Sequence, residues 1–562
     1  MCGIFFTLLK DSSYDLSKID VELVKKRGPD FSNSLTVQTS TFVSYFFASV
    51  LSLRGSQEHQ VTQQPFRCEK TGNILLWNGE IFASHLINVS KNENDGTKFF
   101  ESLSYHSLFN LIESIKGPYA FLFYDKKSEC IYFGRDKFGR RSLLINFNPS
   151  GSRVLTLSSV KSTSMDTLEY QELKANGVYK LDLQTLSLTL FPWSNQIELN
   201  LDYLSNLKSS LPVLNYFISD FNNDITDEFN ENFIHDDLVD KFYLILKQSV
   251  LRRVQNIPNL CKKCSNNLGH LKFSPVNSNL CEHSKIAILF SGGVDSTVLA
   301  ALVDECIPKN EPIDLLNIAF EKSGDKKDDF LVPDRISGLK SLSELNPERK
   351  WNFVEINIKL DELRKERDEI IKHLLYPHQT VLDDSIGCAL WFASRGKGHV
   401  REKDEIIGYT SEAEILILGM GADEQLAGYA RHRTRYEKDG MKALSEEIKM
   451  EMERISSRNL GRDDRILSDH GKESRLPFLD EDVVSFLNEL KVVEKCNMKL
   501  DRGFGEKYLL RKLALKKFGL AFCSKLQKRA IQFGSRVAKM ENIKEKASDI
   551  CDRIAIDLKF SE

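Results

Sequence analysis

The clearest alternation of apolar and polar segments lies in the second half of the chain. Short apolar runs, bounded by polar or glycine-rich turns, predict buried strands at 287–290, 315–320, 351–356 and 414–418. Apolar residues also recur at helical spacing, as in the segment 296–306. Strands that alternate with helices are typical of an α/β fold with a doubly wound parallel sheet, which binds ligands at the carboxyl ends of its strands.

The first half is strand-rich up to about Pro192 and then loses this pattern. From Ile218 to Asp240 the chain is rich in Asp, Asn and Glu, which is typical of a solvated connector. A helix is expected from about Val239 to Gln255, at the start of the second half. We therefore expect an N-terminal domain, a linker and a C-terminal domain, at 1–192, 193–240 and 241–562.

Of the 562 residues, 41% are hydrophobic and 28% are charged, as in a soluble globular chain of several domains. The net charge of -3 gives no general attraction for nucleic acid or anionic lipid, so neither is an expected partner. No window approaches the ~20 apolar residues of a membrane span, and the cysteines are scattered without disulfide-framework spacing. We therefore expect a cytoplasmic protein with small-molecule substrates, whose protein partners the sequence does not identify.

A glycine-rich turn, Ser291-Gly292-Gly293-Val294-Asp295-Ser296, joins the first of these strands to a helix. Backbone N–H groups converge at a helix N-terminus and the helix dipole adds to them, so the turn favours an anion, most often phosphate. It is not the Walker pattern, because no Gly-Lys-Ser/Thr follows. A serine–glycine surface turn is the alternative interpretation, but a turn of this type after a strand resembles the pyrophosphate loop of ATP pyrophosphatases.

The chain begins Met1-Cys2-Gly3, and removal of Met1 would leave Cys2 with a thiol and a free α-amine. An α-amine has a pKa near ~7.7–8 and can act as the general base for the thiol. Such a start alone means little, but further motifs follow it in order: RGPD at 27–30, NGEIF at 78–82, DG at 95–96, GPYAF at 117–121 and YFGRDKFG at 132–139. The series resembles the class II glutamine amidotransferase domain, an N-terminal-nucleophile (Ntn) hydrolase built as an αββα sandwich.

This resemblance gives catalytic roles to Cys2, Asn78 and Gly79. The Cys2 thiolate would attack the side-chain amide of glutamine, and Asn78 and Gly79 would stabilise the resulting oxyanion. Three further residues would bind the glutamine: Arg27, Glu80 and Asp95. An Asn-Gly pair alone would favour a tight hairpin turn, and the ordered series of motifs is what favours a site instead.

One position departs from this family. The arginine that binds the α-carboxylate of glutamine usually stands just before a Leu-Ser pair, but here Val50 precedes Leu51-Ser52 and the nearest arginine is Arg54. On an extended strand Arg54 would lie roughly 13 Å further along, at ~3.3 Å per residue. We therefore expect a weakened or differently built carboxylate site unless the chain folds back.

The last predicted strand runs into a motif at 419–429, GMGADEQLAGY, which resembles the GEGADExxGGY signature of asparagine synthetases. Two further motifs match that family: SRLPFLD at 474–480 and EKYLLR at 506–511. The resemblance covers roughly 1–192 and 240–540, and KRAIQFG at 528–534 indicates the group of asparagine synthetase domain-containing proteins. It implies an Ntn-hydrolase sandwich followed by a doubly wound ATP pyrophosphatase domain with a helical C-terminal part.

In such enzymes the carboxylate of aspartate attacks the α-phosphate of ATP, and ammonia from glutamine then displaces AMP to give asparagine. The resemblance assigns Mg²⁺ to Asp295 and Asp423, because this hard cation prefers carboxylate and phosphate oxygens, and it places Lys507 against developing phosphate charge. The residues that would bind ATP and pyrophosphate are Leu289, Ser291, Gly292, Gly293, Asp295, Ser296, Ile318, Gly419 and Lys507. A charged helix start is the alternative interpretation of Asp423-Glu424.

Met420 is the second departure, because the family signature has a glutamate there. The resemblance links that glutamate to proton transfer from the incoming amine or to holding the acceptor, and methionine can do neither. The sequence therefore predicts glutamine- and ATP-dependent asparagine biosynthesis, with two alternatives. One is the same adenylation chemistry on another carboxylate, and the other is a non-catalytic, partner-binding protein that retains the fold.

An insert at 258–285 carries Cys261-Lys262-Lys263-Cys264, followed by Cys281 and His283. Two such pairs can hold Zn²⁺ tetrahedrally, with His270 as a spare ligand. The alternative is a polar surface insertion with reduced thiols, because the second pair is close-set for a zinc knuckle.

Overall fold

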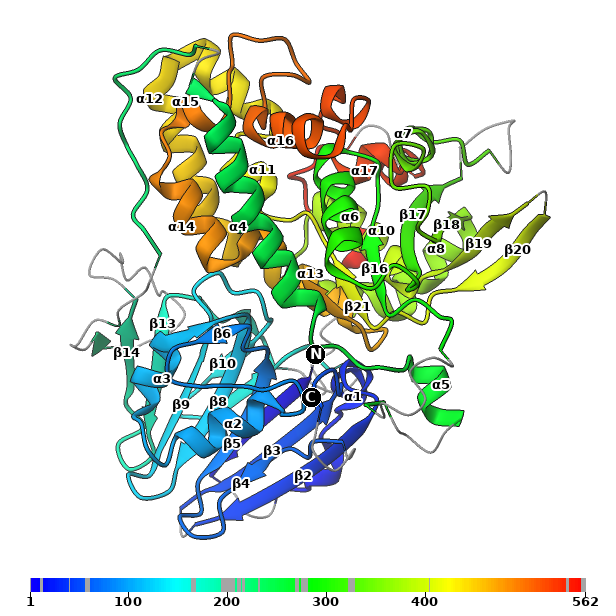
Figure 1. Ribbon diagram of the computed structural model, residues 1–562. Coiled ribbons are helices and arrows are strands. Elements are labelled where there is room, and N and C mark those ends of the chain that lie inside the picture. The colour runs from blue at the N-terminus through cyan, green and yellow to red at the C-terminus, as the bar shows by residue number, and fades with distance from the viewer. Residues whose placement is uncertain are drawn as a thin grey trace.

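The chain folds into an N-terminal half with two mainly antiparallel sheets and a C-terminal half with one mainly parallel sheet (Figure 1). This mixed α/β class is the one expected from the sequence. The computed structural model describes residues 2–10, 14–39, 41–55, 61–162, 168–193, 208–209, 214, 218–230, 233–267, 272–273, 281–321, 329–403, 405–541 and 545–556. No helix within these ranges combines the length and the apolar character needed to cross a bilayer.

The first sheet contains the strand that follows Cys2. Its order is β12 (Gln171–Glu172), β10 (Leu144–Phe147), β11 (Arg153–Ser158), β1 (Gly3–Leu9), β3 (Val43–Val50) and β2 (Phe31–Gln38). Strand β1 is buried throughout because both of its faces are covered, and the hydroxyl of its one polar side chain, Thr7, pairs with the Thr156 hydroxyl at 3.0 Å. Ile4 and Phe6 pack between the two sheets, whereas Phe5 points to the opposite face and joins the cluster that contains Val24 of α1 (Glu22–Arg27).

The second sheet lies over the first, and helices cover its outer face. Its order is β15 (Lys208–Ser209), β14 (Leu188–Pro192), β13 (Gly177–Asp182), β9 (Cys130–Arg135), β8 (Tyr119–Asp125), β5 (Ile74–Gly79) and β4 (Phe66–Arg67). On the outer face, Trp77 stacks on Phe99 of α2 (Asp95–Ser102) with ring centroids 4.6 Å apart, and α3 (Leu108–Ser114) packs beside it. Strand β14 ends at Pro192, where the strand pattern of the sequence also ends.

The third sheet carries the predicted strands of the second half. Its order is β20 (Glu405–Thr410), β19 (Lys397–Glu402), β18 (Trp351–Ile358), β17 (Ile313–Phe320), β16 (Ile286–Leu289), β21 (Ile415–Ile417) and β22 (Glu473–Arg475). Strands β16, β17, β18, β21 and β22 run parallel, and the hairpin of β19 and β20 adds antiparallel strands at one edge. The chain order reverses between β16 and β21, and a doubly wound sheet binds its ligand at such a point.

Helices cover both faces of this sheet because successive residues of its strands point to opposite sides. Leu315 of β17 packs in the cluster that contains Val298 of α6 (Val294–Cys306), and Leu316 packs in the cluster that contains Phe392 of α10 (Val381–Arg395). The other long helices of this half are α4 (Asp236–Val254), α7 (Pro333–Leu342), α12 (Ala430–Ile455), α13 (Gly461–Ser468), α14 (Glu481–Glu489) and α16 (Tyr508–Phe518). The helices predicted from Ser296 and Val239 are confirmed, and both begin slightly earlier, as α6 and α4.

The acidic stretch predicted as a connector, from Ile218 to Asp240, is described apart from 231–232, whereas much of the linker before it, at 194–217, lies outside the described residues. The part of the acidic stretch at 218–230 is packed rather than free, and its end already belongs to α4. The Asn222 N–H donates to the Asn488 carbonyl beside α14 at 2.7 Å, and Ser219 Oγ donates to Glu489 at 2.6 Å. This stretch therefore follows a helix surface, which its acidic composition alone did not indicate.

The two halves meet across buried ion pairs. Asp464 of α13 accepts a hydrogen bond from Arg27 at 2.6 Å and lies 3.5 Å from Arg141. The Ser142 N–H also donates to Asp464 at 3.0 Å. The side chains of Arg27, Arg141 and Asp464 are each only 1% exposed. A single carboxylate of the C-terminal half therefore serves two guanidinium groups of the N-terminal half.

We expect Asp464→Ala to destabilise the protein by about 3–5 kcal/mol, because Arg27 and Arg141 would remain buried without their carboxylate. Urea unfolding followed by circular dichroism measures the change. Asp439→Ala is the matched control, since its pair with Arg435 has side chains 37% and 42% exposed and should contribute less than about 1 kcal/mol. Equal effects of the two substitutions would contradict a structural role for the buried pairs.

Candidate functional site

Cys2 lies just before β1 and contacts side chains from three separate segments. Its N–H donates to Asn78 Oδ1 at 3.0 Å, and Arg27 Nε donates to its carbonyl at 3.4 Å. Gln64 Nε2 donates to Cys2 Sγ at 3.7 Å, and the backbone of Trp77 fixes the Gln64 amide. Burial raises the pKa of the Cys2 thiol, so a nearby base is needed to form the thiolate at neutral pH. Sequence reasoning missed Gln64, which has no local signal.

Asn78 and Gly79 end strand β5 and pair with Ala120 and Tyr119 of β8, so they do not form a hairpin turn. The Asn78 Nδ2 group is buried and has no hydrogen-bond partner among the described residues. A buried donor without an acceptor costs ~1–3 kcal/mol, so an amide held in this way beside a thiol indicates a ligand site. A Cβ on Gly79 would lie 2.7 Å from the Pro118 carbonyl oxygen, so this position requires glycine.

Arg54 lies beside Glu80, which corrects the expectation of an arginine far along a strand. We refer to the group formed by Cys2, Arg54, Asn78, Glu80 and Asp95 as the Cys2 pocket. Strand β3 ends at Val50 and the chain then leaves the sheet, so the spacing of an extended strand does not apply. Arg54 Nε donates to Glu80 Oε2 at 2.7 Å, and Nη2 donates to the Ile81 carbonyl at 3.1 Å. A guanidinium group at this point has the geometry to bind a substrate carboxylate.

Glu80 and Asp95 are both buried in this pocket. Burial, Glu473 and Asp95 raise the pKa of Glu80 to about 7, against the opposing charge of Arg54. Asp95 Oδ2 accepts a hydrogen bond from the Ile81 N–H at 2.7 Å, which fixes the chain just after Glu80. Glu80 and Asp95 thus lie beside the guanidinium group of Arg54, so charges of both signs are present here, as recognition of an α-amino acid requires.

The C-terminal half forms one wall of the pocket. Arg475 of β22 lies 3.7 Å from Glu80. Arg27, which the sequence analysis assigns to glutamine binding, donates to Asp464 at 2.6 Å and to the Cys2 carbonyl at 3.4 Å. In this structure its guanidinium group therefore holds the Cys2 segment against the C-terminal half.

The phosphate loop joins β16 to α6, as predicted, and α7 supports it. Ser337 Oγ donates to the Ser291 carbonyl at 2.8 Å, and Ser341 Oγ donates to the Gly292 carbonyl at 2.7 Å. Gly292 has a φ of +74°, and a Cβ there would lie 2.4 Å from the Ser337 backbone, so only glycine fits. The loop is thus held in a fixed shape at the N-terminus of α6, where an anion is favoured.

Two carboxylates and two ammonium groups meet beside this loop. Lys507 Nζ lies 2.5 Å from Asp295 and 2.6 Å from Asp423, and Lys528 Nζ lies 2.5 Å from Asp423. Although burial favours a higher pKa, the two lysines hold the pKa of Asp423 well below its ordinary value. Asp423 lies in α11 (Ala422–Gln425), so it also begins a helix. Carboxylates that converge on one cation fit Mg²⁺, and sequence reasoning missed Lys528.

A cavity of about 480 Å³ opens beside these groups. It is lined by most of the residues predicted to bind ATP and Mg²⁺, namely Leu289, Ser291, Gly293, Asp295, Ser296, Gly419, Asp423 and Lys507. Gly292 and Ile318 are not among its lining residues. Gly292 is pressed against α7, and the Ile318 side chain is buried in the apolar cluster that also contains α10.

Met420 and Glu424 also lie on the wall of this cavity. Glu424 accepts a hydrogen bond from the Tyr429 hydroxyl at 2.5 Å, and burial and Asp423 raise the pKa of Glu424. Asp334 lines the cavity as well, and burial raises its pKa to about 7. The cavity wall therefore carries one carboxyl group, that of Asp334, whose pKa lies near neutrality.

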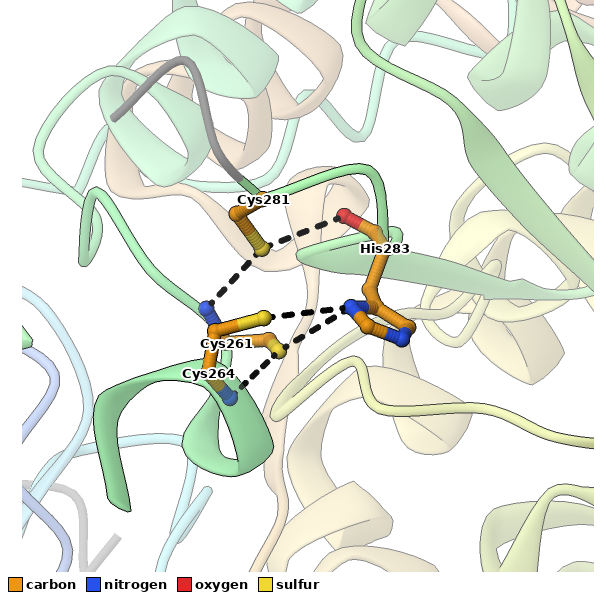
Figure 2. A group of neighbouring side chains, drawn as sticks. All are labelled: Cys261, Cys264, Cys281 and His283. Atoms are coloured by element: carbon orange, nitrogen blue, oxygen red, sulfur yellow. Dashed lines mark hydrogen bonds between the residues drawn. The ribbon is translucent and has the colours of Figure 1, made fainter. Parts of the chain in front are cut away.

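The cysteine and histidine residues of the insert also come together (Figure 2). Cys261 and Cys264, at and near the start of α5 (Lys262–Asn267), face Cys281 and His283. The four candidate ligand atoms all lie within 4.8 Å of one another. His270, the spare ligand of the sequence analysis, lies outside the described residues.

Comparison with known proteins covers nearly the whole chain. A family model described as glutamine amidotransferase domain matches residues 1–190, and one described as asparagine synthase matches 275–442 and 434–552. Asparagine synthetase domain-containing protein 1 of Gallus gallus is 39% identical over 99% of this chain and 100% of its own. The Homo sapiens protein of the same name is 40% identical over 99% of this chain and 98% of its own. An asparagine synthetase domain-containing protein of Saccharomyces cerevisiae is 31% identical over 92% of this chain and 88% of its own.

An electrophilic glutamine analogue should alkylate Cys2 in protein from which Met1 has been removed, and Cys2→Ala should abolish this labelling. Arg54→Met should slow labelling about 10- to 100-fold at low analogue concentration, because a hydrogen bond to a charged group contributes ~1.5–3 kcal/mol. Intact-protein mass spectrometry measures the modified fraction against time.

Cys68→Ala is the control for this labelling, since Cys68 is a partly exposed cysteine of the same half. Loss of labelling in Cys68→Ala, or an unchanged labelling rate in Arg54→Met, would contradict the arrangement described above.

Proposed function

The chain belongs to the family of asparagine synthetase domain-containing proteins, and we propose that it is a glutamine-dependent, ATP-consuming amidotransferase of the asparagine synthetase type. In the proposed reaction, aspartate, glutamine, ATP and water give asparagine, glutamate, AMP and pyrophosphate. The aspartate carboxylate attacks the α-phosphate of ATP, pyrophosphate leaves, and ammonia from glutamine then displaces AMP.

The pocket around Cys2 supports the first half-reaction. After loss of Met1, the free α-amine would take the thiol proton, and the thiolate would attack the glutamine amide carbon. The unpaired Asn78 Nδ2 donor would then stabilise the oxyanion. Arg54 would hold the α-carboxylate of glutamine, and the carboxylate of Asp95 would hold its α-amine.

The cavity at the sheet supports the second half-reaction. The loop at Ser291–Ser296 would hold pyrophosphate, and Lys507 and Lys528 would turn from their carboxylates toward phosphate oxygens. Mg²⁺ held by Asp295 and Asp423 would supply neutralisation of the leaving-group charge.

The observation that carries the proposal is that one residue, Arg475, contacts both the Cys2 pocket and a residue that lines the cavity at the sheet. Its side chain lies 3.7 Å from Glu80 in the Cys2 pocket. Its backbone carbonyl accepts a hydrogen bond at 3.1 Å from Leu418, which lines the ATP cavity. A connection of this kind, through a single residue, suits an enzyme that passes ammonia from one site to the other.

The test is to give the purified protein glutamine, aspartate, ATP and Mg²⁺, and to measure glutamate, asparagine and AMP. We expect all three products, with glutamate lost in Cys2→Ala and AMP retained when ammonia replaces glutamine. Absence of both glutamate and AMP would contradict the proposal and favour a non-catalytic, partner-binding role.

A second candidate keeps this mechanism but uses another carboxylate as the acceptor. Met420 favours it, because an apolar side chain on the cavity wall replaces the family's glutamate and changes what the cavity binds. A screen of carboxylates by pyrophosphate release separates the two candidates. Release that depends on a carboxylate other than aspartate would support the second.

A substitution at position 420 should change the rate of amide formation without changing the affinity for ATP. We expect wild type to bind ATP normally but to form asparagine slowly, because a missing general base typically costs ~10²–10⁴-fold in rate and not in binding. Met420→Glu should then raise asparagine formation with little change in the Kd for ATP, measured by product formation and by calorimetry.

Met420→Gln is the matched control, since it adds a polar side chain that cannot act as a base. A rate increase in Met420→Gln equal to that in Met420→Glu would contradict the base argument. If wild type is already fast and Glu424→Gln abolishes that rate, Glu424 supplies the base and position 420 does not.

A further inference from the structure

We propose that the insert binds a structural zinc ion and that this metal fixes the position of a buried lysine, Lys272, which joins the two halves of the chain. The ligands are Cys261, Cys264, Cys281 and His283 (Figure 2). Neither glutamine hydrolysis nor the ATP chemistry uses these side chains, so this inference stands apart from the proposed function.

The distances suit tetrahedral coordination. His283 Nδ1 lies 3.5 Å from Cys261 Sγ and 3.4 Å from Cys264 Sγ. With Zn–S bonds of ~2.3 Å and Zn–N bonds of ~2.0–2.1 Å, a sulfur and a nitrogen ligand at a tetrahedral angle lie about 3.5–3.6 Å apart. Figure 2 shows the three sulfur atoms and the imidazole turned toward one common space.

The backbone around the cysteines favours thiolates, the form of cysteine that binds metal. The Cys261 N–H donates to Cys281 Sγ and the Cys264 N–H donates to Cys261 Sγ, both at 3.4 Å. Donors of this kind stabilise negative charge on sulfur. All described cysteines are free of disulfides, and a set of three thiolates and one imidazole selects zinc over hard cations such as Mg²⁺.

Lys272 is tied by backbone hydrogen bonds to the residues just before the first ligand. The N–H groups of Asn259 and Leu260 both donate to the Lys272 carbonyl, at 2.9 and 3.1 Å. Asn259 Nδ2 also donates to the Phe273 carbonyl at 3.0 Å. The segment that enters the metal site therefore also holds the turn that carries Lys272.

The Lys272 ammonium group joins the two halves. Its Nζ lies 2.7 Å from Asp30 of the N-terminal half and 2.8 Å from Glu414, which directly precedes β21. Asp30 also accepts a hydrogen bond at 2.8 Å from the Ser52 N–H, in the segment that carries Arg54. A lysine side chain only 7% exposed therefore reaches from the insert to the edge of the Cys2 pocket.

A metal explains how so short an insert can hold a buried charge. Its helix α5 has six residues, and a helix of that length is marginal without external support. Zinc binding supplies folding free energy directly, because the ligands are brought together only in the folded state.

The first test is metal analysis of the full-length wild-type protein, purified under reducing conditions without added metal. We expect one zinc ion per chain by inductively coupled plasma mass spectrometry. Replacement of zinc by Co²⁺ should give the strong visible absorption of a tetrahedral thiolate site. Cys264→Ser and Cys281→Ser should lose the zinc, whereas Cys306→Ser, which changes a cysteine outside the cluster, should retain it.

The second test concerns Lys272. Calorimetry of wild type should show the two halves unfolding in one transition, and zinc removal by a chelator should lower the melting temperature and separate the halves. Lys272→Met should retain zinc but unfold like the metal-free protein. Lys285→Met is the matched control. Lys285 pairs with Glu311 at 2.9 Å, and this pair does not join the two halves of the chain.

The proposal is overturned if the wild-type protein contains no zinc and gives no thiolate absorption with Co²⁺. This outcome does not depend on whether any variant folds. Zinc retained in both cysteine variants would place the metal elsewhere and would also overturn it. A third outcome concerns the lysine alone. If the cysteine variants lose zinc but Lys272→Met unfolds in the same way as Lys285→Met, the joining role of Lys272 is overturned.

Discussion

Pairing of buried charges across the boundary between the two halves holds the Cys2 pocket and the cavity beside Asp423 in one arrangement. Asp464 accepts from Arg27 and pairs with Arg141, and Arg140 donates to Glu481 at 2.5 Å. Transfer of each such charge from water costs several kcal/mol, and this cost is offset only when every partner is in place. Unlike an apolar surface, which tolerates sliding, this boundary therefore favours a single alignment of the halves.

The motif SRLPFLD at 474–480 lies at this boundary and depends on the alignment of the two halves. Arg140 Nη1 donates to the Leu479 carbonyl at 2.7 Å, and Asp480 accepts from Arg253 at 2.7 Å. Arg475 of the same motif reaches Glu80. The motif therefore contributes structure between the pockets instead of ligands for the nucleotide, although the sequence reveals only that it belongs to the family.

Local patterns predicted local structure well, and contacts between distant residues were the part that sequence reasoning could not supply. The strand at 315–320, the helix α6 and the turn between β16 and α6 follow from periodicity and glycine placement, and the structure confirms them. Arg54 was misplaced because where a strand ends depends on tertiary packing. Gln64 gave no signal, and Lys528 stood out only as part of a family motif, because their roles arise only when separate segments meet. The contact of Arg27 with Asp464 joins residues 437 positions apart.

The two lysines beside the loop at Ser291–Ser296 act as internal counterions in the proposed nucleotide cavity. Lys507 and Lys528 already neutralise Asp295 and Asp423, so a free divalent cation would have to compete with two tethered ammonium groups. A magnesium–nucleotide complex brings phosphate oxygens that can take over both lysines while the metal takes the carboxylates. On the proposed function, the cavity would therefore discriminate by exchange of counterions and would accept metal and nucleotide together more readily than either one alone.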